Sequence, residues 1–242
     1  MPRVNAIRIA LATASHVRES VYPARCVACG RFREGLFCAP CAARLVPATG
    51  GGRCPFCSGP WTEAGNCPSC VGWDQLDGGR AAFAMEGPAR SLVHALKYDR
   101  VRSIAPLLAR AMQPLADSVP FDGAFPIPLH RSRLRSRGFN QADLVLDALR
   151  WRRADGALCR SRKTATQVGL APHERRRNVS GAFDYTGPRL DGARLVLVDD
   201  VITTGATANE CARVLKEHGA REVTVVAFAR ANPASAVTSA DF

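Results

Sequence analysis

Two adjacent carboxylates and a hydroxyl-rich loop form the clearest chemical pattern in the sequence. Asp199 and Asp200 follow an apolar run, and the segment Thr203-Thr-Gly-Ala-Thr207 comes directly after them. A loop of this kind that opens a helix can bind phosphate, because backbone N–H groups are free there and the helix dipole favours an anion. Like charge keeps the carboxylates away from phosphate, so they suit hydroxyls or Mg²⁺. The pattern predicts a ribose 5-phosphate site.

A buried strand and a helix are needed to position these groups. The run Leu195 to Val198 is apolar throughout, as expected of a strand buried on both faces of a parallel sheet. The following helix is predicted to reach about His218. Thr207 with Glu210 also fits a capping box, so Thr207 has two candidate roles, helix cap and phosphate ligand.

A second candidate site is the predicted loop from Leu129 to Gly138, which follows a strand ending in Pro-x-Pro. It carries four arginines in seven residues: Arg131, Arg133, Arg135 and Arg137. Guanidinium groups match phosphate oxygens in pairs of hydrogen bonds. Taken alone, the loop is equally a solvated basic segment or a contact for nucleic-acid backbone. Because ligands of open α/β sheets lie beyond the carboxyl ends of the strands, a pyrophosphate-binding role is favoured opposite a ribose 5-phosphate.

Eight of the ten cysteines form four Cys-x-x-Cys pairs near the start of the chain. They are Cys26 and Cys29, Cys38 and Cys41, Cys54 and Cys57, and Cys67 and Cys70. Two such pairs complete a tetrahedral zinc site, and the count predicts two structural zinc ions. Disulfides and a redox pair are the alternatives. The spacing favours two ribbons in series, the first two pairs on one ion and the last two on the other, but it leaves a cross-braced pairing open.

Composition and hydropathy limit the class of protein. The formal charge of +12 calls for an anionic partner, either nucleic acid or a polyphosphate. No apolar run is long enough to span a bilayer, so we expect no membrane insertion. The start of the chain shows no convincing export signal, which favours a cytoplasmic protein with reduced thiols.

The order of elements predicts three parts. Residues 1–25 are expected to hold a short amphipathic helix, residues 26–72 a double zinc-ribbon domain, and residues 81–242 the main domain, with a linker from Trp73 to Arg80 containing Gly78 and Gly79. Apolar runs predict strands at 81–85, 124–125, 157–160 and 223–229, and helical spacing predicts helices between them, one of them starting after an N-cap at Asn140. Alternating strands and helices imply an α/β fold with a parallel sheet.

Several motifs together resemble a known family. The segment Val196 to Thr207 resembles the phosphoribosyl pyrophosphate (PRPP) loop of type I phosphoribosyltransferases. The cysteine pairs, Leu96-Lys-Tyr98, Pro128-Leu-His-Arg131, Arg137-Gly-Phe-Asn-Gln141, Gln167-x-x-Leu170, Arg175-x-x-Asn178 and Phe183 extend the likeness to the ComF family. Those bacterial proteins are linked to competence for DNA uptake and carry a double zinc ribbon ahead of a type I phosphoribosyltransferase-like domain.

The resemblance implies a role for individual residues. Asp199 and Asp200 would hold the ribose hydroxyls, and Arg131 and Arg137 would face the pyrophosphate, with Lys97 as a further contact. The 5-phosphate would be held by Thr203, Thr204, Gly205, Ala206 and Thr207. Two departures stand out: Asp99-Arg100 replaces a glycine turn, and Thr203 stands where 6-oxopurine enzymes carry an acidic base. The second departure disfavours a hypoxanthine- or guanine-type acceptor.

The leading hypothesis is therefore an Mg²⁺-dependent phosphoribosyltransferase that binds PRPP and releases pyrophosphate, with the acceptor open. In the alternative, the protein binds single-stranded DNA and works with competence machinery, and the PRPP fold is a scaffold or sensor. Phe32, Phe37, Phe56 and Trp61 are candidates for base stacking in that role.

Overall fold

The structure is a computed structural model of the 242-residue chain. It describes residues 24–32, 35–62, 67–116, 118–162 and 172–232. These residues form two compact units, which divide between Leu45 and Val46. The helix expected within residues 1–25 lies outside the described residues except for the last two positions.

The first unit is small, and in its described residues it contains one short helix, α2 (Ala39–Ala42). Its buried side chains are cysteines, with Ala28 and Phe37 partly buried against them. The second unit begins with the other two Cys-x-x-Cys pairs, and a 3₁₀ helix, η1 (Pro68–Cys70), carries Cys70. The second half of the predicted zinc region therefore packs with the α/β unit. The domain boundaries given above stay a prediction.

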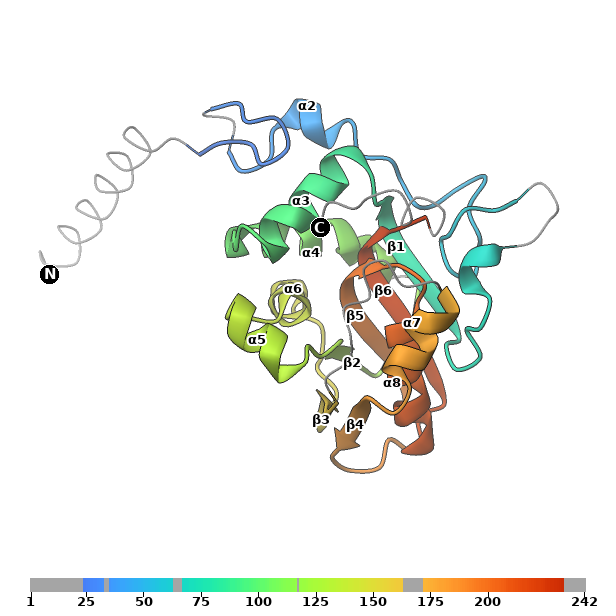
Figure 1. Ribbon diagram of the computed structural model, residues 1–242. Coiled ribbons are helices and arrows are strands. Elements are labelled where there is room, and N and C mark those ends of the chain that lie inside the picture. Colours follow the sequence, from blue (N-terminus) through green and yellow to red (C-terminus); the bar gives the residue numbers. More distant parts are fainter. Residues whose placement is uncertain (1–23, 33–34, 63–66, 117, 163–171, 233–242) are drawn as a thin grey trace, which may run out of the picture. The chain divides into compact units, whose positions relative to one another are not determined.

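A four-stranded parallel sheet forms the centre of the second unit (Figure 1). Its order is β1 (Gly78–Ala84), β6 (Glu222–Arg230), β5 (Arg194–Ile202) and β2 (Gly123–Pro126). The apolar run Leu195 to Val198 is buried, and Leu197 lies between Phe125 on β2 and Val225 on β6. The prediction of a parallel α/β fold is confirmed.

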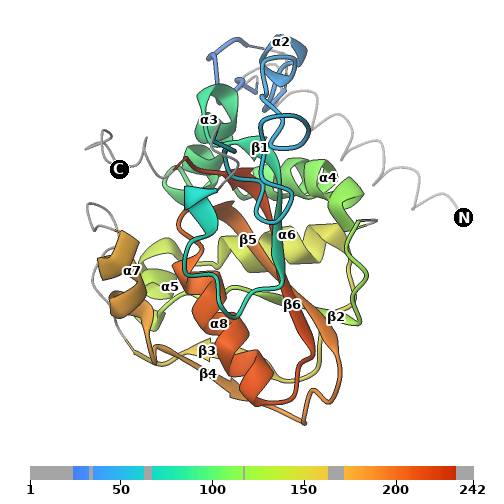
Figure 2. The ribbon, with the colours of Figure 1, turned by 90° about the vertical axis from the view of Figure 1, so that its right-hand side faces the viewer.

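Helices cover both faces of this sheet. Two helices, α4 (Ala105–Ala116) and α6 (Gln141–Leu149), contact each other and one face, while α8 (Ala206–Glu217) lies on the other (Figure 2). The helix α7 (Pro172–Val179) packs against α8. Another helix, α3 (Gly87–Lys97), follows β1 and leads through the 3₁₀ helix η2 (Arg102–Ile104) into α4. None of the helices in the described ranges has the length and apolarity needed to cross a membrane.

Three predicted segments differ from the structure. Gly78 and Gly79, assigned to a linker, begin β1. The predicted arginine loop contains a helix, α5 (Arg131–Arg137). The predicted strand at 157–160 exists as β3 (Ala157–Arg160), but it pairs antiparallel with β4 (Phe183–Thr186) in a separate two-stranded sheet. A strand of only four residues gives no information about which strand it pairs with, which explains this last difference.

Candidate functional site

The loop after β5 has the geometry of an anion site. Helix α8 begins at Ala206, its N-cap is Gly205 with a φ of 74°, and the Thr204 hydroxyl accepts a bond from the Ala206 N–H at 3.4 Å. The first N–H groups of this 12-residue helix have no partner within the helix, so they can bind an anion. The capping-box interpretation of Thr207 is wrong, because Gly205 holds the cap position. Glu210 instead accepts from the Gly181 N–H at 2.7 Å.

A cavity of about 580 Å³ opens beside this loop. Both acidic residues of β5 line it, as do Lys97 and four of the five predicted phosphate-loop residues: Thr203, Gly205, Ala206 and Thr207. Thr204 is not among the lining residues, and its carbonyl oxygen instead accepts from the Trp73 indole N–H. The volume suits a ligand of nucleotide size.

Asp200 is buried in a hydrogen-bonded network. Its side chain is 1% exposed, one carboxylate oxygen lies 2.8 Å from Lys97 Nζ, and the other accepts from Gln141 Nε2 at 3.4 Å. Although burial opposes ionisation, the neighbouring Lys97 ammonium holds the pKa of Asp200 below its usual range. Asp200 is therefore an ionised acceptor supplied by β5 and held by α3 and α6.

Asp199 is the more weakly ionised member of the pair. Its Oδ1 accepts from the backbone N–H of Asp200 at 2.8 Å. Burial, and next the negative charge of Asp200, raise the pKa of Asp199 well above its ordinary value. In the described residues, Asp200 is the member of the pair that bonds to Lys97 and Gln141. A bound cation or a set of hydroxyl donors would favour the ionised form of Asp199.

The helix α5 divides the four arginines into two faces. Its N-cap is His130, whose Nδ1 accepts from the Ser132 N–H at 3.2 Å, and its C-cap is Gly138, with a φ of 80°. Residues four apart share a face of a helix. Arg133 and Arg137 line the cavity, whereas Arg131 and Arg135 are exposed and are not among its lining residues. Of the two arginines expected at the pyrophosphate, Arg137 is at the cavity and Arg131 is on the other face.

Two residues at the cavity, Gln141 and Arg160, received no site role from the sequence, and Arg133 was named only as one of four arginines. Gln141 accepts from an Arg137 N–H at 2.6 Å as well as donating to Asp200, so it connects the two ends of the site. Its position is set by Asn140, which caps α6 and donates to the carbonyl of Ile127 at 3.1 Å. The predicted N-cap at Asn140 is confirmed. This cap was the signal in the sequence that could have placed Gln141 at the start of the helix.

Arg160 adds a buried positive charge to the cavity wall. It is 8% exposed on β3, and burial, together with repulsion from Arg133, lowers its pKa. Its guanidinium lies 5.2 Å from the centre of the Phe183 ring. An anion bound between the guanidinium groups of Arg133 and Arg160 would offset the repulsion between them. The only signal for Arg160 in the sequence was an arginine at an inward-facing position of a short predicted strand.

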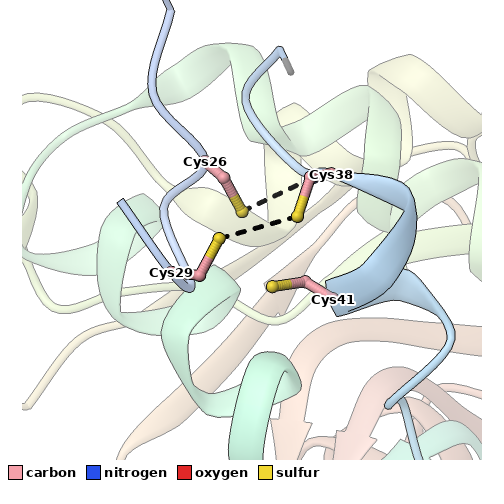
Figure 3. A group of neighbouring side chains, drawn as sticks. All are labelled: Cys26, Cys29, Cys38 and Cys41. Atoms are coloured by element: carbon pink, nitrogen blue, oxygen red, sulfur yellow. Dashed lines mark hydrogen bonds between the residues drawn. The ribbon is translucent and has the colours of Figure 1, made fainter. Parts of the chain in front are cut away.

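The first four cysteines converge on one point (Figure 3). Cys26 and Cys29 come from one loop, and Cys38 and Cys41 come from the start of α2. All four sulfur atoms lie within 4.8 Å of one another, and those of Cys29 and Cys38 are 3.6 Å apart. Zinc–sulfur bonds of about 2.3 Å in a tetrahedron separate sulfurs by roughly 3.8 Å. The quartet therefore fits zinc.

The third and fourth Cys-x-x-Cys pairs form a second quartet of the same kind: the sulfur atoms of Cys54, Cys57, Cys67 and Cys70 again lie within 4.8 Å of one another. The closest sulfurs, on Cys57 and Cys67, are 3.4 Å apart, far beyond a disulfide bond. The pairing of the Cys-x-x-Cys segments is thus in series, as the spacing favoured, and the cross-braced alternative is excluded. Among the described residues, potential ligand groups of three or more gather only at these quartets.

Comparisons with known proteins agree with this architecture. Residues 17–71 match the family described as "Double zinc ribbon domain", and residues 142–240 match "Phosphoribosyl transferase domain". The chain is 38% identical to DNA utilization protein YhgH of Escherichia coli O157:H7, over 59% of this chain and 67% of the relative. It is 39% identical to competence protein F of Haemophilus influenzae, over 46% and 51%. It is also 36% identical to a ribose-phosphate pyrophosphokinase of Vibrio parahaemolyticus, over 52% and 39%. The chain belongs to the ComF family of double-zinc-ribbon proteins with a phosphoribosyltransferase domain, which includes YhgH and competence protein F.

Proposed function

We propose that the protein binds PRPP in the cavity at the end of β5 and transfers its phosphoribosyl group to an acceptor. The observation that carries this proposal is the arrangement of three charged groups around one cavity. The N-terminus of α8 with its glycine cap, two arginines of α5, and the acidic residues Asp199 and Asp200 all line this cavity. A ligand with two phosphate-bearing ends and a diol matches this set of groups.

Each residue then has a defined task. The N–H groups at the start of α8 and the hydroxyls of Thr203 and Thr207 bind the 5-phosphate. Asp200, kept ionised by Lys97, accepts hydrogen bonds from the ribose hydroxyls, and Arg133 and Arg137 bind the pyrophosphate. Arg160 adds positive charge on the same side, which stabilises the departing group.

The residues at this site fit an Mg²⁺ ion that would be bound jointly by the protein and the phosphate oxygens of the ligand. The chain offers two carboxylates there, and Mg²⁺ in phosphate-binding enzymes takes one or two carboxylates and fills its remaining positions with phosphate oxygens and water. Asp199 and Asp200 would hold it, and when bound it would neutralise charge on the pyrophosphate oxygens. Its binding also favours the ionised form of Asp199.

The reaction exchanges one bond at ribose C1. The bond from C1 to the pyrophosphate oxygen breaks, and its electron pair leaves with pyrophosphate. The acceptor's lone pair forms the new bond, and the acceptor loses a proton. Thr203 offers no acid or base for a 6-oxopurine, so we propose an acceptor of another class.

Pyrophosphate release from PRPP, measured against a panel of bases and amines, tests the proposal. Asp200→Asn should abolish release. Asp122→Asn should leave it unchanged, because Asp122 is an exposed carboxylate that binds Arg194 at the opposite end of β5. Unchanged turnover in Asp200→Asn would sink the mechanism. Tight PRPP binding without product from any acceptor would identify a sensor in place of an enzyme.

Exposed aromatic side chains favour a second candidate, binding of single-stranded DNA. Phe32, Phe56 and Trp61 are 50%, 37% and 42% exposed, whereas Phe37 packs against the first quartet. Two relatives carry the names DNA utilization protein and competence protein F. Bases stack on exposed rings with about 1–3 kcal/mol each.

Fluorescence anisotropy with labelled single strands across a salt series tests this candidate. Affinity should fall steeply with salt, because Lys and Arg displace counterions from the phosphates. Trp61→Ala should weaken binding about 10-fold or more at every salt concentration. No binding at low salt would exclude the candidate.

A further inference from the structure

We infer that Arg230 and Trp73 are positioning residues that connect the main chain of the phosphate loop to the second cysteine quartet. The inference rests on the proposed function, because it assigns what holds the loop that would bind the 5-phosphate. Both residues lie in the second unit, as do the loop and this quartet.

Three successive carbonyl oxygens before α8 are bound by these two side chains. Arg230, the last residue of β6, donates to the carbonyls of Ile202, at 3.0 Å, and Thr203. The indole N–H of Trp73 donates to the carbonyl of Thr204 at 2.7 Å. The peptide groups that lead into the helix N-terminus are therefore fixed by residues that belong neither to the loop nor to α8.

The same guanidinium reaches the second quartet. Arg230 Nε donates to the carbonyl of Cys57 at 3.0 Å, one of its terminal nitrogens donates to the carbonyl of Ser69 at 3.0 Å, and that nitrogen lies 3.8 Å from the sulfur of Cys57. Arg230 is 1% exposed, so its charge has almost no contact with water. One side chain thus joins the phosphate loop to both Cys-x-x-Cys segments of the quartet.

Zinc at this quartet would compensate the buried charge of Arg230. Four thiolates and one Zn²⁺ carry a net charge of about −2. A buried cation is stable only beside an opposite charge and with its hydrogen bonds satisfied. In the described part of the chain, no carboxylate lies within ion-pair distance of Arg230. The metal-loaded quartet therefore favours the position in which Arg230 holds the loop.

Trp73 also explains why the loop requires glycine at position 205. A Cβ on Gly205 would lie 2.2 Å from the Trp73 ring, and a φ of 74° is already unfavourable for other residues. The Arg230 guanidinium lies 5.4 Å from the centre of the same ring. Trp73 therefore lies close to both the cap of α8 and the guanidinium of Arg230.

Two ligands that each represent one end of PRPP separate positioning of the loop from general stability. Calorimetric titration of the full-length, zinc-loaded protein would use ribose 5-phosphate for the loop and inorganic pyrophosphate with Mg²⁺ for the arginines of α5. Trp73→Phe removes the indole donor and keeps a ring, and Arg230→Lys keeps the charge and loses the forked donors. Both variants should bind ribose 5-phosphate about 10- to 100-fold more weakly and pyrophosphate within about 2-fold of wild type.

Trp151→Phe is the matched control, because Trp151 is not among the residues that line the cavity and packs against Phe121. It should bind both ligands as wild type does. If Trp73→Phe binds ribose 5-phosphate with wild-type affinity, the inference is wrong. Equal losses for both ligands would also overturn it, since they indicate a general defect. Wild-type protein that binds neither ligand would refute the proposed function instead. Should Arg230→Lys not fold, the result for Trp73→Phe decides.

The two quartets provide a second comparison. Cys67→Ser and Cys29→Ser should each remove one zinc equivalent, measured by atomic emission. Only Cys67→Ser should weaken binding of ribose 5-phosphate, because the second quartet alone contacts Arg230. Equal affinity in the two variants would show that zinc at the second quartet does not act on the loop.

Discussion

At the scale of single residues, the two acidic side chains of β5 differ in what surrounds them. Asp200 has an ammonium at 2.8 Å and an amide donor at 3.4 Å, whereas Asp199 has the N–H of its neighbour at 2.8 Å and faces the negative charge of Asp200. Two carboxylates with consecutive positions in the sequence therefore contribute to stability with opposite signs.

Asp200→Asn should destabilise the protein by on the order of 3 kcal/mol at pH 7. The substitution leaves the Lys97 ammonium, which is 21% exposed, without its carboxylate. Asp199→Asn should be neutral or stabilising, because an amide oxygen can still accept from the Asp200 N–H and one negative charge is removed. Urea unfolding of both variants in Mg²⁺-free buffer checks the contrast. Similar losses in the two would contradict it.

The stability difference between Asp199→Asn and wild type should grow as pH rises. A carboxyl group whose pKa is raised on folding binds its proton more tightly in the folded state. The contribution of Asp199 to folding stability is therefore most favourable at pH values below its ordinary pKa of 3.8. This contribution is lost as the pH rises from there to the pKa of the folded state. The Asp199→Asn variant has no carboxyl group at this position, so it does not lose stability in this way as the pH rises. Unfolding measured between pH 5.5 and about pH 8 tests this, since the zinc contribution cancels between the two proteins; a constant difference would refute it.

At the scale of elements, the helix α5 decides which arginines reach the cavity. The sequence indicated basic groups at this place, and the structure confirms Arg137 there. A loop was predicted because arginines carry no apolar periodicity, yet the helix is marked at both ends. Gly138 is a typical C-terminal glycine, and the N-cap is the less usual His130. Without the helix, the sequence could not separate Arg133 from Arg131.

Arg133→Ala and Arg137→Ala should each weaken pyrophosphate binding by about 10- to 100-fold, the equivalent of roughly 1.5–3 kcal/mol for a charge-assisted hydrogen bond. Arg131→Ala and Arg135→Ala are the matched controls on the opposite face of α5, and they should change the affinity less than about 3-fold. Titration calorimetry with Mg²⁺ and pyrophosphate measures all four. A larger loss for Arg131→Ala than for Arg133→Ala would restore the role that the family resemblance implied.

Other elements show how far sequence reasoning extends here. Buried strands and the Asn140 cap could be predicted because each depends on a few neighbouring residues. The order of the sheet and the pairing of β3 with β4 depend on contacts between distant segments. The same holds for Arg160, Arg230 and Trp73, whose roles arise from partners far away in the sequence. A lone arginine or tryptophan gives no sign of such partners.

At the scale of the whole molecule, the two zinc sites belong to units with very different cores. Within the part of the chain that the structure describes, the buried residues of the first unit are three cysteines, whereas the second unit has an extensive core of Leu, Val, Ile and Phe side chains around its sheet. A structural zinc ion supplies about 10 kcal/mol or more of folding free energy, and a core of cysteines cannot replace it. The same metal therefore has unequal importance for the two units.

Removing zinc with a strong chelator should unfold the first unit and leave the second folded. Hydrogen exchange should show that residues 24–45 lose their protection, while peptides from β5 and β6 keep theirs, because the buried run Leu195 to Val198 does not depend on metal. Peptides covering 202–207 should exchange faster than before, since the charge of Arg230 loses its compensation at Cys57. The Cys29→Ser variant separates these effects. In it, residues 24–45 should lose protection from exchange, and the exchange of residues 202–207 should not change. Protection that persists in 24–45 after complete metal removal would show that this unit folds without zinc.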